Sequence, residues 1–99
     1  MRGLKKFLVI KDESIIIRKA GMDTTEMDGE KVMMDLDKGE YFMMNEVGSR
    51  IWDIIQEPVS CKEVIDTLLK EYNVEESECR EKAISFIRRL GEADLVSIK

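Results

Sequence analysis

The side chains that most often carry out chemistry in proteins are scarce in this sequence. Histidine is absent, and the two cysteines, Cys61 and Cys79, are far apart and form no C-x-x-C motif. The absence of histidine removes the Ser-His and Cys-His nucleophile pairs and the commonest metal ligand. Two cysteines alone would leave a zinc site incomplete, and free cysteine is often buried, so we expect structural roles for both.

The acidic side chains do not indicate catalysis either. No pair of carboxylates lies among apolar neighbours in the way that a matched acid and base would. The acidic run at Glu75, Glu76 and Glu78 is typical of a solvated helix start, and the phosphate-binding pattern G-x-x-x-x-G-K does not occur. We therefore expect a protein that is not an enzyme, with no catalytic residue, no metal and no cofactor.

Composition places the chain among small globular proteins. Its 99 residues fit one domain, and 43% hydrophobic residues permit a packed core. The net charge of -5 argues against general nucleic-acid binding, which needs clustered Lys and Arg. The apolar run near the start stops at Lys11 and Asp12, too soon for a signal peptide, and no run is long enough to span a membrane. The expected location is the cytoplasm, with reduced thiols.

The first half of the chain has the pattern of β-strands. Consecutive isoleucines favour a strand at Ser14–Lys19, and Ala20–Glu30, which is rich in Gly and Thr, is typical of a loop. The segment Lys31–Leu36 alternates as a half-buried strand does. Next, Asp37–Gly39 suits a three-residue hairpin loop, and Glu40–Met44 is predicted to be the returning strand.

The alternation also assigns the methionines of this hairpin to faces. We expect Met34 and Met44 in the core, whereas Tyr41 and Met43 face the other way, where an apolar patch needs cover. Methionine adapts its shape and is common on surfaces that accept varied peptides.

The second half predicts three helices. Asn45 is a good N-cap for the first helix, Ser60 and Glu63 form a capping box for the second, and Ser77 is predicted to cap the third. Gly48, inside the first helix, indicates close approach of another backbone, because glycine otherwise costs about 1 kcal/mol there.

Strands followed by helices indicate an α+β fold. The natural candidate is a winged helix-turn-helix, with a three-stranded antiparallel sheet followed by three helices. Residues 1–13 would be an N-terminal arm and residues 14–99 the winged-helix domain. The apolar tail Leu95–Ile98 is expected to pack back on the core.

The strand Glu40–Met44 has one partner in simple hairpin order, so its other side is open. A peptide could add there as a further strand, with the third helix as the opposite wall of a groove. Two alternatives remain open. The third helix carries Arg80, Lys82, Arg88 and Arg89, as a DNA-recognition helix would, although its interleaved glutamates favour i,i+4 charge pairs. The open edge could also serve dimerisation.

One ordered set of residues resembles the PqqD-like family. It spans about Ser14–Ile98 and includes the family's central strand-to-helix signature, its second helix and its final helix. Leu commonly precedes the signature Asn where this chain has Met44, and Gly-Leu commonly stands where it has Asp94-Leu95. The residues that carry the resemblance are Gly39, Tyr41 to Met44, Asn45, Gly48, Ile51, Trp52, Ser60, Glu63, Leu68, Leu69, Tyr72, Val74, Phe86 and Leu90.

The resemblance implies a RiPP recognition element, a non-catalytic domain that binds the leader segment of a ribosomally made precursor peptide. In this family the leader adds as a strand to the third strand and lies against the third helix. It would then be presented to a modifying enzyme or leader protease, as in lasso-peptide or pyrroloquinoline-quinone pathways. The implied protein is a monomer or weak dimer with no nucleic-acid or membrane partner. Carried onto this sequence, the peptide-binding residues are Glu40, Tyr41, Phe42, Met43 and Met44 on the strand, and Lys82, Phe86 and Arg89 on the helix.

Overall fold

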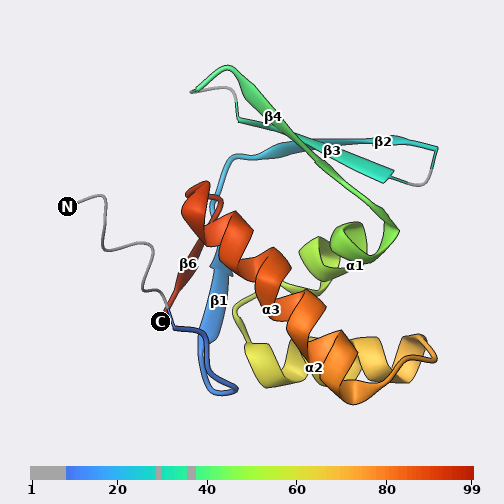
Figure 1. Ribbon diagram of the computed structural model, residues 1–99. Helices are drawn as coiled ribbons and strands as arrows, with labels where there is room; N and C mark the ends of the chain where they lie inside the picture. The colour runs from blue at the N-terminus through green and yellow to red at the C-terminus, as the bar shows by residue number, and fades with distance from the viewer. Residues whose placement is uncertain (1–8, 29, 36–37) are drawn as a thin grey trace.

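The computed structural model describes residues 9–28, 30–35 and 38–99. These residues form the strands and helices drawn in Figure 1. In chain order they are β1 (Ile15–Arg18), β2 (Asp23–Met27), β3 (Glu30–Asp35), β4 (Glu40–Met44), α1 (Glu46–Ile54), β5 (Val59–Ser60), α2 (Cys61–Glu71), α3 (Glu76–Glu92) and β6 (Val96–Ile98).

The strands in this part of the chain form two antiparallel sheets. The upper sheet has the order β2-β3-β4, and the lower sheet has the order β5-β1-β6. Figure 1 shows the upper sheet lying across α1 and α3, with β1 and β6 running down beside α3. The predicted α+β fold, with an antiparallel sheet and three helices, is confirmed. The winged helix-turn-helix description and the division at residue 14 stay predictions.

The strands form two sheets instead of the single predicted sheet, and the first strand has other partners than expected. The strand predicted at Ser14–Lys19 is β1, but its partners are β5 and β6 instead of the hairpin. The partner β6 comes from the apolar tail, which packs back as expected. Val96 and Leu95 are buried there. The prediction missed this pairing because it joins segments about eighty residues apart, which no local pattern reports.

The segment Ala20–Glu30 is not a loop, and that prediction was wrong. It contains β2, which pairs with β3 so that Met27 is opposite Glu30. Only Asp28 and Gly29 stand between these two in the sequence, and Asp28 has a left-handed φ of 54°. Asp-Gly between two strands is the strongest short hairpin signal, because both central residues of the favoured turn need positive φ.

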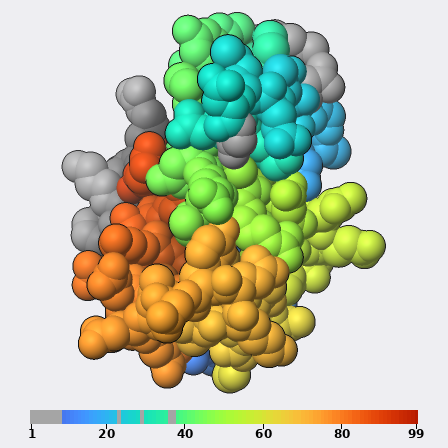
Figure 2. Space-filling view, turned by 90° about the vertical axis from the view of Figure 1, so that its right-hand side faces the viewer, coloured from blue at the N-terminus to red at the C-terminus, as the bar shows by residue number. Residues whose placement is uncertain are grey.

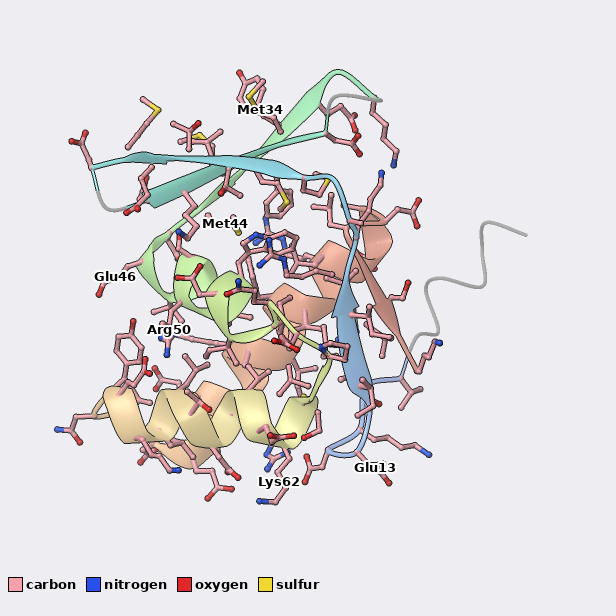
Figure 3. All side chains as sticks on the ribbon, turned by 180° about the vertical axis from the view of Figure 1, so that it is seen from behind. Glu13, Met34, Met44, Glu46, Arg50 and Lys62 are labelled. Atoms are coloured by element: carbon pink, nitrogen blue, oxygen red, sulfur yellow. The ribbon has the colours of Figure 1, made fainter. Side chains whose placement is uncertain are left out.

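The inner face of the upper sheet is the opposite of the one predicted for β3. Met33 is fully buried against the helices, while Met34 is 43% exposed on the outer face, so the assignment of Met34 to the core was wrong. Lys31 and Asp35 share this inner face with Met33, and each forms an ion pair there. Lys31 forms an ion pair with Asp53 at 3.5 Å, and Lys19 forms one with Asp35 at 3.2 Å. Figure 3 shows Met34 above the sheet and Met44, buried as predicted, below it.

The predicted helix starts are confirmed for two of the three helices. The Asn45 side chain accepts a hydrogen bond from the Gly48 N–H at 2.8 Å, and Ser60 and Glu63 form the expected capping box. Ser77 does not cap α3, because the N-cap is Glu75 and the helix begins at Glu76, two residues earlier than a Ser77 cap predicts. The Glu75 side chain makes no capping hydrogen bond. The acidic first turn of α3 favours this start instead through the helix dipole.

The core lies between the two sheets and the helices. Trp52 is 1% exposed, and the Arg18 guanidinium lies 4.2 Å from the centre of its ring. Cys61 and Cys79 are buried and free, as expected, and burial raises the pKa of both thiols. In the part of the chain that the structure describes, no helix is long and apolar enough to cross a membrane.

Candidate functional site

The strand β4 has a free edge. Within residues 9–28, 30–35 and 38–99 its only strand partner is β3. Its outward side chains are unusually apolar for such an exposed place, since Tyr41 is 72% and Met43 61% exposed. A strand with unpaired main-chain groups and apolar side chains is a template for pairing with another extended chain.

The hydroxyl of Ser49 reveals which main-chain groups point to that edge. It accepts a hydrogen bond from the Lys31 N–H at 3.0 Å and donates one to the Met44 carbonyl at 3.2 Å. The main-chain groups of these two opposed residues therefore face each other across the β3-β4 pair. Because direction alternates along an antiparallel strand, Tyr41 and Met43 direct their N–H and C=O groups to the free edge.

Figure 1 shows the later part of α3 lying below β4 and sloping the same way. The rings of Phe42 and Phe86 meet edge to face, with centroids 6.3 Å apart. The Arg89 guanidinium lies 5.5 Å from the centre of the Phe42 ring. These contacts join strand and helix into the two walls of one groove.

Two hollows lie along this groove, one toward each end of β4. The first hollow, of about 390 Å³, is open to solvent, and so is the second, of about 320 Å³. The first hollow is lined by Met22, Met33, Asp35, Glu40, Tyr41, Phe42, Ala93 and Leu95. The second hollow is lined by Glu30, Met43, Met44, Asn45, Phe86 and Arg89.

Gly48 allows the helix wall to approach. A Cβ atom at this position would lie 3.0 Å from two carbons of the Phe86 ring, which is tighter than most Cβ contacts, so the ring would have to shift by a few tenths of an ångström. The sequence predicted a close approach at Gly48 but assigned it to a backbone. The structure shows that an aromatic side chain fills the space, so that part of the prediction was wrong.

The structure brings together most of the predicted binding residues. All five residues from Glu40 to Met44, together with Phe86 and Arg89, line the two hollows. Lys82 does not, because it lies nearer the start of α3 and forms an ion pair with Glu78 at 3.2 Å. The same helix pairs Arg80 with Asp12 and Glu76, so the expected charge pairs are present.

Sequence reasoning missed the far end of the first hollow. Ala93 and Leu95 reach it because Asp94 adopts a left-handed φ of 62°, which turns the chain back after α3. The Leu95 N–H then donates to the Leu90 carbonyl at 2.9 Å. Asp is one of the few residues other than glycine that takes this conformation. The Asp94-Leu95 pair stands where the family commonly has Gly-Leu. It was the feature of the sequence that could have predicted this left-handed turn.

The two walls of this site differ in character. The described residues include no cluster of three or more His, Cys, Asp or Glu able to hold a metal ion. The walls instead offer main-chain hydrogen-bonding groups on one side and aromatic and aliphatic surface on the other. Asp35, which lines the first hollow at one end of the groove, accepts a hydrogen bond from the Lys38 N–H at 3.3 Å. Such an arrangement fits an extended peptide with apolar side chains.

Two solved structures are similar to this one. TbiB1 in complex with the TbiA(beta) leader peptide is 28% identical, with a TM-score of 0.73 over 82% of this chain and 94% of that chain. Lasso peptide synthetase B1 complexed with the leader peptide is 21% identical, with a TM-score of 0.72 over 83% of this chain and 96% of that chain. At that lower identity, the second likeness shows the fold alone.

Sequence comparison identifies the family. No curated protein matches the chain significantly. The family model of coenzyme PQQ synthesis protein D (PqqD) matches residues 30–96, which include the whole of β4, α1, α2 and α3. The chain therefore belongs to the PqqD family.

Proposed function

We propose that this protein is a RiPP recognition element that binds the leader segment of a ribosomally synthesised precursor peptide by strand addition to β4. It has no catalytic role of its own and presents the bound precursor to a modifying enzyme or leader protease. The observation that carries the proposal is the free edge of β4 opposite α3. There, Tyr41 and Met43 direct unpaired main-chain groups outward beside an apolar groove.

The relatives support the same ligand class. TbiB1, whose fold covers most of this chain, is described in complex with a leader peptide. The side chains of a strand added to β4 would alternate between the groove and the outer face of the sheet. The inward ones would meet Phe42, Phe86 and Arg89, and the outward ones would lie beside Tyr41 and Met43.

The alternative of a winged-helix DNA-binding regulator is less favoured. Arg80 and Lys82 form ion pairs within α3, and Arg89 lies over an aromatic ring. A DNA-binding helix needs such cations free for phosphates, and its binding would weaken steeply with salt. Absence of binding to duplex DNA at low salt would remove this alternative.

Strand addition is tested by comparing two substitutions of Met43. The probe is a peptide selected on the wild-type protein from a library of random 16-residue peptides. Met43→Pro removes the outward N–H without touching the bonds to β3, and should weaken binding about 100-fold. Met43→Ala keeps the N–H and should weaken it only a few-fold. Calorimetry gives the affinities, and amide shifts in an NMR titration locate the peptide.

The result is decisive in either direction. Amide shifts concentrated in β4 and α3 would support the proposal. Equal affinity for a folded Met43→Pro variant and the wild-type protein would refute strand addition at this edge, as would shifts confined to other elements.

A further inference from the structure

A third hollow lies beyond the end of β4, where α1 begins. It has a volume of about 130 Å³ and is almost wholly apolar. Val47 and Val74, which belong to its lining, are 41% and 45% exposed. Figure 2 shows the start of α1 (green) meeting the surface of the α2–α3 connection and early α3 (orange) on this side of the molecule. The full lining is Val47, Leu68, Tyr72, Val74, Glu78, Cys79, Lys82 and Ala83.

The three hollows follow one order along both walls. On the first wall they are lined by residues 40–42, then residues 43–45, and then Val47. Along α3 and its C-cap they are lined by Ala93, then Phe86 and Arg89, and then Glu78, Cys79, Lys82 and Ala83. The third hollow is therefore the next compartment of the same groove.

The spacing of the compartments matches an extended peptide. The second and third hollows are centred about seven residues apart on α3, which is roughly 10 Å at 1.5 Å per residue. An extended chain covers that distance in about three residues. A peptide paired with β4 would thus reach the third hollow about three residues after it passes Asn45.

Recognition at the third hollow must differ from recognition at β4. The chain turns into α1 at Asn45, whose side chain caps the helix, so no strand edge continues beyond this point. Only a side chain can enter. A dry cavity of about 150 Å³ can hold a benzene ring, so this hollow suits a single aliphatic or aromatic side chain.

We propose that the third hollow is an anchor site for one apolar side chain of the same bound peptide, placed about three residues beyond the segment that pairs with β4. This inference rests on the proposed function. It gives Lys82 a place different from the predicted one, at the rim of the anchor instead of beside β4. It also accounts for the exposure of Val47 and Val74, because the bound peptide would cover both.

The test uses the selected peptide and a version truncated on the side that passes Asn45. Val74→Asp puts a charge at the mouth of the hollow, on an exposed connection where folding should survive. It should weaken binding of the full peptide about tenfold or more, since burial of an apolar side chain is lost. The truncated peptide should bind the variant and the wild-type protein equally. Val9→Asp, at a valine that is 66% exposed and lines none of the three hollows, is the matched control and should change neither affinity.

The outcomes separate this inference from the proposed function. If Val74→Asp binds the full peptide as the wild-type protein does, while the amides of β4 still shift, the anchor is refuted and strand addition stands. Equal weakening of the full and the truncated peptide by Val74→Asp would also refute the anchor. So would a Val74→Asp variant whose only change is in self-association, measured by sedimentation. If no selected peptide shifts the amides of β4, the proposed function fails and the anchor with it.

Discussion

The upper sheet has two outer strands, and they differ in what lies beneath them. β4 faces the aromatic and aliphatic side chains of α3, and its two hollows are lined by Phe42, Phe86 and four methionines. β2 lies over a hollow of about 250 Å³ whose lining is mostly charged. Its residues are Glu26, Lys31, Glu46, Ser49, Arg50, Asp53 and Tyr72.

This difference indicates that a free edge alone does not make a binding site. Among the described residues neither edge has a further strand partner, and both strands are exposed. Only at β4 does the second wall provide apolar surface that an added strand could bury. The charged side chains under β2 make burial of an apolar peptide costly, which also protects that edge from unwanted pairing.

Proline at each edge gives the largest expected contrast. The N–H and C=O groups of Tyr41 point to the free edge of β4. The same alternation along β2 directs the N–H and C=O groups of Thr24 to the outer edge of that strand. Tyr41→Pro should weaken peptide binding about 100-fold, or roughly 2.7 kcal/mol, whereas Thr24→Pro should leave affinity unchanged. Calorimetry on the selected peptide measures both. Equal losses at the two edges would show that the comparison is wrong.

A smaller effect is expected from Gly48→Ala, which disturbs the helix wall without touching the edge. The new methyl group would push the Phe86 ring by a few tenths of an ångström, because its carbons lie 3.0 Å away. We expect binding several-fold weaker. Stability should be nearly unchanged, since alanine gains about 1 kcal/mol of helix propensity to offset the crowding.

The double variant Gly48→Ala, Phe86→Leu distinguishes crowding from a change in the helix itself. A smaller residue at position 86 frees the space, so the added methyl group should then cost nothing further in affinity. If the cost of Gly48→Ala persists in the Phe86→Leu background, the contact with Phe86 is not its cause.

Local sequence signals predicted the elements that carry local information. Asn45, and Ser60 with Glu63, cap helices through contacts only three residues long, so their patterns predicted the starts of α1 and α2 correctly. The returning strand β4, and the exposure of Tyr41 and Met43, were also predicted correctly. Gly39 takes a φ of 67°, as its predicted bulge position requires, while Leu36 and Asp37 of that hairpin lie outside the described residues.

The errors come from partners that are distant in sequence. Alternation showed that β3 has two faces but not which one is buried, and the choice of Met34 over Met33 failed. Lys31 and Asp35 make the buried face look polar until Asp53 and Lys19 are placed beside them. Likewise, Lys82 has the right helical spacing from Phe86, but spacing alone does not show where β4 ends and α1 begins.

The smallest expected effect lies on the charged side of the molecule and concerns stability. Arg50 of α1 donates two hydrogen bonds to the carboxylate of Glu71 at the end of α2, at 2.7 and 2.6 Å, and Figure 3 shows Arg50 pointing toward that helix end. These bonds lower the pKa of Glu71 below its ordinary value of 4.5. The unfolded chain therefore binds a proton more readily than the folded protein does. The stabilisation is complete above pH 4.5 and is lost as the pH falls through the lowered pKa.

Arg50→Met should accordingly lower Tm slightly at pH 7, and the difference from the wild-type protein should shrink toward pH 3. Both side chains are substantially exposed, so the effect should be small. Peptide affinity should not change, because Arg50 lies under β2 and lines neither hollow beside β4. Thermal melts across this pH range, with Glu57→Gln as a control at an exposed carboxylate, measure the first effect, and calorimetry measures the second. A loss of peptide affinity in Arg50→Met would mean that the bound peptide extends under β2, contrary to the separation of the two edges.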